Sequence, residues 1–134
     1  MDQTDRKILA ELARNSRITM KELGEKVHLT SPAVTSRVEK LEQAGVIEGY
    51  SIIVNQSKLG CAVHCFITVM LDNFHHGAYL KFIEEKKSYI LRHHKTSGEG
   101  CYLAECRFPD NEQLTTFLTG LNQYGNYKLS IVIG

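Results

Sequence analysis

Hydrophobic side chains in the first fifty residues recur at helical spacing in three short segments. The first segment, at about residues 4–14, has one apolar stripe, made of Ile8, Leu9, Leu12 and Ala13. The second segment begins with a strong start signal, because Thr19 can cap a helix and Glu22 stands three residues later. The pattern therefore predicts two helices, of which the second ends near Val27.

A third amphipathic segment follows after a connection of only a few residues. Thr30 or Ser31 can cap it, Pro32 suits its first turn, and Gly45 is a typical left-handed end. The expected buried face repeats at i, i+4 and i+7, as Val34, Val38 and Leu41. A short helix, a tight turn and a second amphipathic helix are typical of a helix-turn-helix.

The opposite face of the third helix carries short polar side chains near its start and then two cations. Short side chains let a helix enter the major groove, and an arginine can bind a guanine edge or a phosphate. We therefore predict contacts with duplex DNA from Thr30, Ser31, Pro32, Ala33, Thr35, Ser36, Arg37 and Lys40. On an isolated helix the same pattern would indicate a solvated face, so this prediction depends on the helix-turn-helix context.

Two short apolar runs flank the turn signal Glu48-Gly49 and predict a wing or a linking strand over residues 46–55. Tyr50 in this segment either contacts phosphate or packs on the third helix. A polar stretch then marks a boundary. We expect a DNA-binding domain at 1–50, a linking strand at 51–60 and a second domain at 61–134.

The second domain opens with a strand, expected at 61–71, whose alternate residues form two different faces. One face is wholly apolar and should lie under helices: Cys61, Val63, Cys65, Ile67, Val69 and Leu71. The other face is mixed and is typical of a partner surface: Ala62, His64, Phe66, Thr68 and Met70.

The remaining pattern predicts a helix at about 75–87, strands at 89–95 and 101–108, a helix after Asp110, and a last strand at 127–133. The first helix should bury Tyr79, Leu80, Phe82 and Ile83. The second has a clean stripe of Leu114, Phe117, Leu118 and Leu121. This order is the ferredoxin-like βαββαβ arrangement, so the chain is α+β, with two helices on one side of an antiparallel sheet.

The uncovered face of such a sheet usually meets another copy of the chain, and we expect a homodimer built sheet to sheet. The chain has a net charge of +1, and its first fifty residues carry eight basic and eight acidic side chains. A neutral head predicts weak DNA affinity per copy, because neutralising phosphates dominates affinity, so several heads should act together.

Composition excludes some other classes of protein. No apolar run approaches the roughly 20 residues that span a bilayer, and the polar, acidic N-terminus is unlike a secretory signal. We therefore expect a cytoplasmic protein without a membrane segment. The cysteines, at 61, 65, 101 and 106, form no CxxC pair and should be reduced, buried thiols. We expect no metal and no cofactor.

Three motifs carry a family resemblance: Asp5-Arg6-Lys7-Ile8-Leu9, Leu29-Thr30-Ser31-Pro32 and Arg37-Val38-x-x-Leu41-Glu42-x-x-Gly45-x-Ile47-x-Gly49-Tyr50. On these residues the chain resembles the Lrp/AsnC (leucine-responsive, feast/famine) transcriptional regulators over nearly its whole length. The resemblance implies a winged helix-turn-helix followed by a ferredoxin-like RAM or ACT-like domain. It also implies a homodimer that assembles further, often to an octamer, and bends or wraps DNA.

In that family, small effectors, mostly amino acids, bind near the turn between the second and third strands. The matching residues here are Ser97, Gly98, Glu99, Gly100, Cys101 and Tyr102. Many relatives have an aspartate where Cys101 stands, and a thiol does not suit an ammonium group. Glu99 is the nearest carboxylate that could replace it, so the expected effector is an amino acid, another ligand, or none.

Two other functions compete with a sequence-specific regulator. One is an architectural protein that compacts DNA with little sequence preference. The other is an enzyme like the sirohaem decarboxylases, which share the two-domain plan and use histidines; this chain has His64, His75, His76, His93 and His94. Because adjacent strand residues face opposite ways, His93 and His94 cannot form one site. The sequence favours a DNA-binding regulator that is not an enzyme, in the cytoplasm and associated with the nucleoid.

Overall fold

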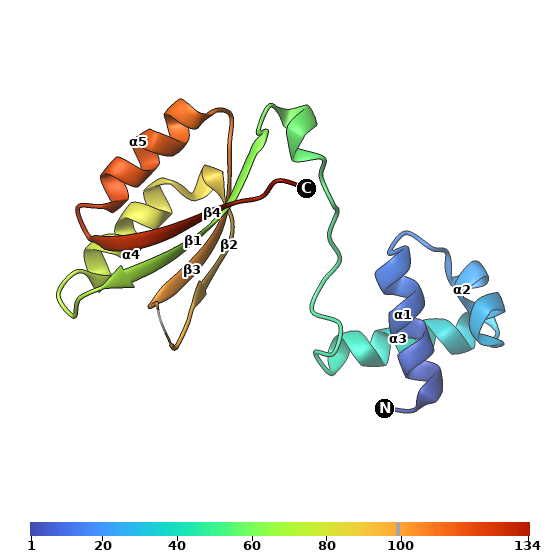
Figure 1. Cartoon of the computed structure of the whole chain (residues 1–134). Coiled ribbons are helices and arrows are strands. Elements are labelled where there is room, and N and C mark those ends of the chain that lie inside the picture. The colour runs from blue at the N-terminus through green and yellow to red at the C-terminus, as the bar shows by residue number, and fades with distance from the viewer. Residues whose placement is uncertain (99) are drawn as a thin grey trace. The chain divides into compact units, whose positions relative to one another are not determined.

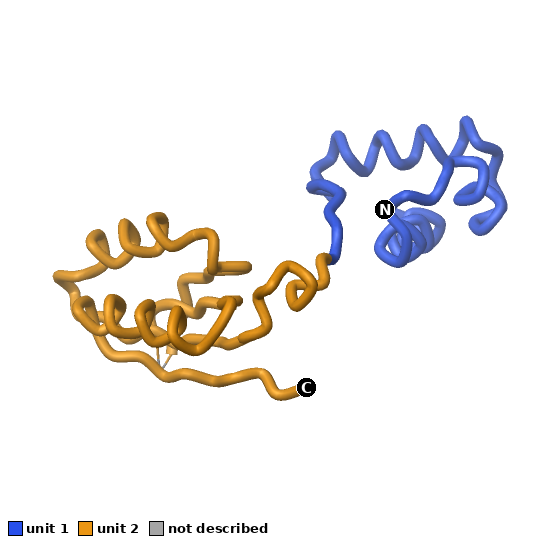
Figure 2. The backbone as a smooth tube through the Cα atoms, turned by 90° about the horizontal axis from the view of Figure 1, so that it is seen from above, with its two compact units in different colours: residues 1–53 blue, residues 54–134 orange. Residues whose placement is uncertain are grey.

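The computed structural model describes residues 1–98 and 100–134. The chain divides into two compact units, Met1–Ile53 and Val54–Gly134, which Figure 2 colours separately. Each unit has its own hydrophobic core. We call the first unit the head and the second the sheet unit.

The head consists of three helices, α1 (Gln3–Arg14), α2 (Met20–Val27) and α3 (Ser31–Gln43), as Figure 1 shows. Apolar side chains from all three meet in one core, with Ile8, Leu23 and Val34 fully buried. The predicted stripe of the first helix is correct for Ile8 and Leu12, whereas Ala13 is exposed. The three predicted helices are therefore confirmed, and so is the helix-turn-helix.

The start of each helix is explained by its cap. Thr19 Oγ1 accepts a hydrogen bond from the Glu22 backbone N–H at 3.1 Å, and Thr30 Oγ1 accepts one from the Ala33 N–H at 3.3 Å. These bonds satisfy donors that the first turn of a helix leaves free. At the other end of α3, Gly45 adopts the expected positive φ, +74°. The caps therefore fix the residues at which α2 and α3 begin and at which α3 ends.

The turn between α2 and α3 depends on two residues that the hydrophobic pattern does not reveal. His28 ends α2 in the left-handed conformation, with φ +60°. Gly24 lies so close to the next segment that an added Cβ would be 2.5 Å from the Leu29 carbonyl oxygen. A side chain at position 24 would therefore push α3 away from α2.

Residues 46–55, for which the sequence predicts a wing or a linking strand, contain neither helix nor strand in the single chain (Figure 1). That detail of the prediction is not observed, because these residues have no strand partner within their own chain. The segment is apolar all the same, with Ile52, Ile53 and Val54 exposed. A short 3₁₀ helix, Gln56–Leu59, follows it.

The sheet unit is an antiparallel sheet of four strands in the order β2-β3-β1-β4, with two helices packed on one face (Figure 1). The strands are β1 (Val63–Leu71), β2 (Ile90–Lys95), β3 (Tyr102–Phe108) and β4 (Gly125–Ile131). The helices are α4 (His76–Glu85) and α5 (Asn111–Leu121), and a short 3₁₀ turn, Lys87–Tyr89, precedes β2. The chain order and the antiparallel pairing confirm the predicted ferredoxin-like fold.

The core of the sheet unit lies between the sheet and its helices. Cys65, Ile67 and Val69 point into it from β1, as the alternation predicts. The expectation that Leu80 also points inward is wrong, because this side chain is 44% exposed. The buried residues of α4 are Tyr79, Phe82 and Ile83. Leu80 lies about 100° around the helix from Tyr79, so its side chain points away from the core.

Candidate nucleic-acid interface

Helix α3 separates a buried face from a solvent face. Val34, Val38 and Leu41 pack into the head core. The residues that are exposed on the other side are Pro32, Ser36, Glu39, Lys40 and Gln43. Four of the predicted contact residues, Ser31, Ala33, Thr35 and Arg37, are half-buried, and Thr30 is exposed at the cap. Sequence reasoning missed Glu39 and Gln43, although helical periodicity places both on this face.

The hydroxyl groups at the start of α3 differ in what they can offer to a ligand. Thr30 Oγ1 already accepts from the Ala33 N–H. Thr35 donates its hydroxyl proton to the Ser31 carbonyl oxygen at 2.8 Å, within the same helix. Ser36 is exposed one turn further along the outer face. The proton of Thr35 is thus engaged within the helix, whereas the exposed hydroxyls of Thr30 and Ser36 can donate outwards.

Arg37 is held by two carboxylates from the start of α1. Its Nη1 lies 2.8 and 2.6 Å from the two carboxylate oxygens of Asp2 and 3.3 Å from Asp5 Oδ1. The hydrogen bond from Arg37 lowers the pKa of Asp2 to about 2, and the same bonds raise the pKa of the arginine. These residues lie more than thirty positions apart, so no local pattern reveals the contact.

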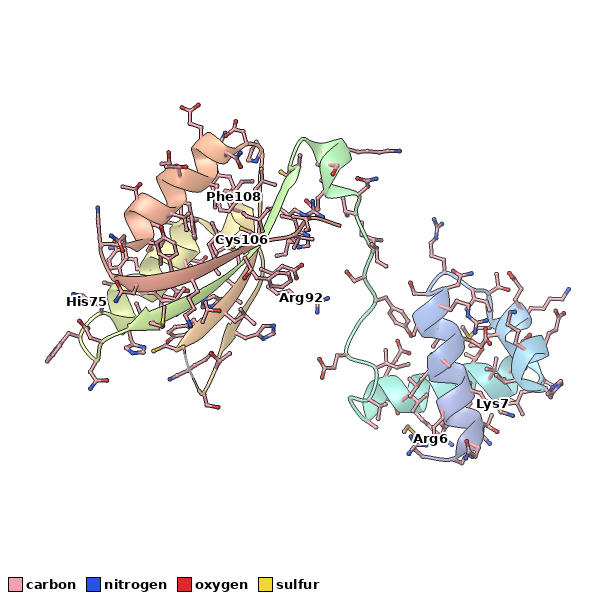
Figure 3. The ribbon with its side chains drawn as sticks, viewed as in Figure 1. Arg6, Lys7, His75, Arg92, Cys106 and Phe108 are labelled. Carbon is pink, nitrogen blue, oxygen red and sulfur yellow. The ribbon has the colours of Figure 1, made fainter. Side chains whose placement is uncertain are left out.

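A hollow of about 490 Å³ adjoins this ion pair on the head. Its lining includes both cations of α3 together with one of the carboxylates: Met1, Asp5, Arg37, Lys40, Leu41, Ala44 and Val46. Lys40 is exposed and free to approach a phosphate, whereas Arg37 is tied to α1. Figure 3 shows Arg6 and Lys7 on the α1 turn beside the N-terminus, where they add further positive charge.

Tyr50 lies at the end of the head, next to Glu42 of α3. Burial, followed by the charge and hydrogen bond of Glu42, raises the pKa of the Tyr50 phenol. This contact favours the second of the two alternatives for Tyr50, packing on the third helix. Tyr50 also lines an apolar hollow of about 350 Å³ against α1, together with Leu9 and Ile47.

The sheet unit leaves the second face of its sheet without helices. Strand register places Glu105 and Ser130 beside Phe66, and Leu103 and Lys128 beside Thr68. Phe66 is 37% exposed at the centre of this face. His64 Nε2 lies 2.6 Å from Glu105 Oε2, and Figure 3 shows Arg92 on the same side, away from the helices. The open face thus has one partly exposed aromatic ring, Phe66, at its centre, with polar and charged side chains around it.

The predicted effector stretch combines an exposed turn with a half-buried end. Ser97 and Gly98 are exposed, Gly98 has φ +101°, and Glu99 lies outside the described residues. The Thr96 backbone N–H donates across the turn to the Cys101 carbonyl oxygen, and the Cys101 N–H donates to the Val69 carbonyl oxygen of β1. These bonds fix the backbone on both sides of the exposed turn.

Gly100 and Tyr102 complete this stretch from the inner side. An added Cβ at Gly100 would be 2.5 Å from Thr68 Cγ2, so the backbone runs close to β1. The Tyr102 ring is buried and stacks on His93 with ring centroids 5.1 Å apart. Tyr102 therefore belongs to the core rather than to the exposed turn.

Two of the histidines, His76 and His93, contact the ring of Tyr102. His93 faces the helices, where its Nε2 lies 2.8 Å from the Tyr79 hydroxyl, and His94 is exposed on the opposite face, as predicted. His75 pairs with Asp72 at the start of α4. Within residues 1–98 and 100–134, no group of three or more metal-binding side chains is found.

The cysteines are free thiols. Cys65 and Cys106 are buried opposite each other on β1 and β3, as predicted, whereas Cys61 and Cys101 are only half-buried.

No helix in the described part of the chain is long and apolar enough to cross a membrane.

Residues 1–48 match the family model described as "Winged helix-turn-helix DNA-binding". The HTH-type transcriptional regulator LrpA of Bacillus subtilis is 56% identical over 134 residues, covering all of this chain and 98% of that protein. Among solved structures, B. subtilis LrpC matches with a TM-score of 0.91 at 30% identity, covering all of this chain and 95% of that one.

The complex of the transcriptional regulator NMB0573 from Neisseria meningitidis with L-Met matches with a TM-score of 0.90 at 27% identity, covering all of this chain and 90% of that one. Sequence identity and structural similarity to these regulators extend over the whole chain, and the head contains the helix-turn-helix. The chain therefore belongs to the Lrp/AsnC family of HTH-type transcriptional regulators and is a DNA-binding regulator.

Proposed function

We propose that this regulator reads a specific duplex through the outer face of α3. The observation that carries the proposal is the exposed, short-chained surface at the start of a capped α3, where Pro32 and Ser36 precede Lys40. Such a surface can enter the major groove, with small groups against bases and the cation against phosphate. The contact set comprises Thr30, Ser31, Pro32, Ala33, Thr35, Ser36, Arg37 and Lys40.

The assembled form, in our proposal, is a homodimer joined through the open sheet face and extended to an octamer. The partly exposed Phe66 at the centre of that face supports this assembly. The head carries balanced charge, so one head neutralises few phosphates, and linked heads would supply affinity through effective concentration. An array of heads would also bend or wrap the duplex.

For the effector, we propose an amino acid or a related small molecule bound at Ser97, Gly98, Glu99, Gly100, Cys101 and Tyr102. Support comes from the L-Met complex of the similar regulator NMB0573 and from the fixed backbone around the turn. With a thiol at Cys101, an ammonium group has to find its counter-charge elsewhere. We place the protein's action in the cytoplasm, at the nucleoid, without catalysis.

The test is a gel shift at fixed salt with the duplex upstream of the protein's own gene and a scrambled duplex of equal composition. We expect preferential binding to the first, in a ladder of slow complexes. Equal binding to both duplexes would favour the architectural alternative, and the specificity ratio decides between them.

A matched pair of variants assigns the reading surface. Ser36→Glu places a carboxylate on the outer face of α3 and should abolish the shift through repulsion of phosphate. Thr116→Glu adds the same charge to the exposed face of α5 and should leave the shift unchanged. Equal behaviour of the two variants would contradict the proposal that α3 reads DNA.

A further inference from the structure

The contact between α1 and α3 places one guanidinium between two carboxylates. Arg37 Nη1 reaches both oxygens of Asp2 and one oxygen of Asp5, at 2.6–3.3 Å. At neutral pH these three side chains together carry a net charge of −1. In the part of the chain that the structure describes, the hydrogen bonds of Arg37 all run through Nη1. We call Asp2, Asp5 and Arg37 the acidic clamp.

The two carboxylates are held to different degrees. The Asp5 side chain is only 18% exposed, whereas that of Asp2 is 56% exposed. Asp2 precedes α1, where its Oδ1 accepts the Asp5 N–H at 2.8 Å. Asp2 lies outside the core of the head, so losing its bond to Arg37 leaves that core unchanged, while the less exposed Asp5 stays beside the arginine. Because the bond from Arg37 lowers the pKa of Asp2 to about 2, the outer carboxylate is ionised at neutral pH.

A carboxylate and a phosphate offer a guanidinium the same kind of paired oxygen acceptors. In the free protein Asp2 therefore gives Arg37 the same kind of oxygen acceptors that a DNA phosphate would offer. Binding to DNA of arbitrary sequence depends almost wholly on neutralising phosphates. A clamp that neutralises Arg37 and leaves an extra negative charge beside α3 weakens that kind of binding most.

We propose that the acidic clamp is a specificity determinant of DNA binding. It withholds Arg37 from the phosphates of arbitrary sequences and releases it only to a duplex whose fit to α3 compensates for displacing Asp2. The inference rests on the proposed reading of DNA by α3 and adds Asp2 and Asp5 to it. The competing explanation is an ion pair that only joins α1 to α3.

Asp2→Asn is the decisive variant, because asparagine caps a helix as well as aspartate does, so α1 keeps its start. Affinities are measured for the upstream duplex and the scrambled duplex at several salt concentrations. We expect scrambled-duplex affinity to rise about threefold or more and its salt dependence to steepen by about one phosphate contact. Affinity for the upstream duplex should change less, so the specificity ratio falls.

Two controls separate the clamp from general charge effects. Glu25→Gln removes one exposed carboxylate from α2, outside the clamp, and should raise scrambled-duplex affinity much less. Adding Arg37→Ala to Asp2→Asn should cancel the gain, because the freed guanidinium produces it. Three outcomes would overturn the proposal. Scrambled-duplex affinity could rise equally in Glu25→Gln, the specificity ratio could stay unchanged in Asp2→Asn, or the gain in scrambled-duplex affinity could persist after Arg37→Ala is added.

The same titrations include Ser36→Glu, which tests the reading surface on its own. If Ser36→Glu abolishes binding while Asp2→Asn leaves the ratio unchanged, α3 reads DNA and the clamp is structural only. If Ser36→Glu binds like the native chain, the proposed reading surface fails, and the clamp as a specificity device fails with it.

Discussion

The head and the sheet unit each bury one apolar layer and expose a second surface, and the two exposed surfaces differ in kind. On α3 the outer face is polar and carries charges of both signs, with Ser36, Glu39 and Lys40. On the sheet the open face is centred on Phe66, with the His64–Glu105 pair beside it. We propose the first surface as the contact with duplex DNA and the second as the contact with another copy of the chain.

The two units also differ in what stabilises them. The core cluster of the head contains eight buried residues and that of the sheet unit thirteen, within the described chain. A smaller core contributes less hydrophobic free energy, so helix caps and close turns matter more in the head. We therefore expect substitutions at turns to be most damaging in the head and substitutions on surfaces to act mainly through assembly in the sheet unit.

The largest expected effect comes from Phe66→Glu, because it places a charge at the centre of the proposed dimer contact. Burying an unpaired carboxylate there is strongly unfavourable, so the assembly should dissociate to a monomer near 15.2 kDa. Light scattering at micromolar concentration measures the mass of the assembly. DNA affinity should fall as the assembly dissociates. Thr116→Glu is the control for added charge. An intact assembly in Phe66→Glu would show that the open sheet face is not the dimer contact.

The second effect tests the dependence of the head on its turn. Gly24→Val puts a branched side chain against the Leu29 carbonyl and should destabilise the head by about 2–3 kcal/mol. Gly49→Val is the control, since a Cβ there meets no atom within 4 Å. Calorimetry should show a lowered transition for the head and an unchanged one for the sheet unit. Equal stability of the two variants would contradict the role of Gly24.

A third, smaller effect concerns the outer cation of α3. Lys40→Ala should weaken binding to the upstream and scrambled duplexes alike, because a lysine on phosphate carries no sequence information. The slope of log affinity against log salt should fall by about one. Titration at three salt concentrations measures this. A loss confined to the upstream duplex would mean that Lys40 reads a base.

The smallest effect is a pH dependence in the sheet unit. Burial, with a lesser contribution from the His94 charge, lowers the pKa of His93 below its unfolded value, so the folded state holds fewer protons. This contribution to stability is complete above about pH 6.5 and is lost as the pH falls through the folded pKa.

Urea unfolding between pH 7.5 and 5.5 tests this dependence. The native chain should lose a little stability on acidification, and His93→Gln should lose less. His94→Gln, on the exposed face, should keep most of the pH dependence, because burial is the larger cause of the lowered His93 pKa. If the free energy of unfolding changes with pH equally in His93→Gln and the native chain, His93 is not the source of the pH dependence.

Most of the fold could be predicted from the sequence, because the signals are local. The Thr19 and Thr30 caps, the helical stripes and the alternation along β1 each depend on residues a few positions apart. The order of the elements then leaves few arrangements, and the ferredoxin-like sheet is one of them. Leu80 and Ala13 are exposed although they belong to the predicted apolar stripes. Each directly follows a buried residue and lies at the edge of the buried face of its helix.

What the sequence by itself determined is the family, the elements and the polar character of α3, since each follows from periodicity or from contiguous motifs. Only the tertiary structure decided that Gly24 must be small, that His64 meets Glu105, and that Arg37 is held by Asp2. These contacts join residues from different elements. Their existence depends on how the elements pack, and no spacing along the chain encodes that packing.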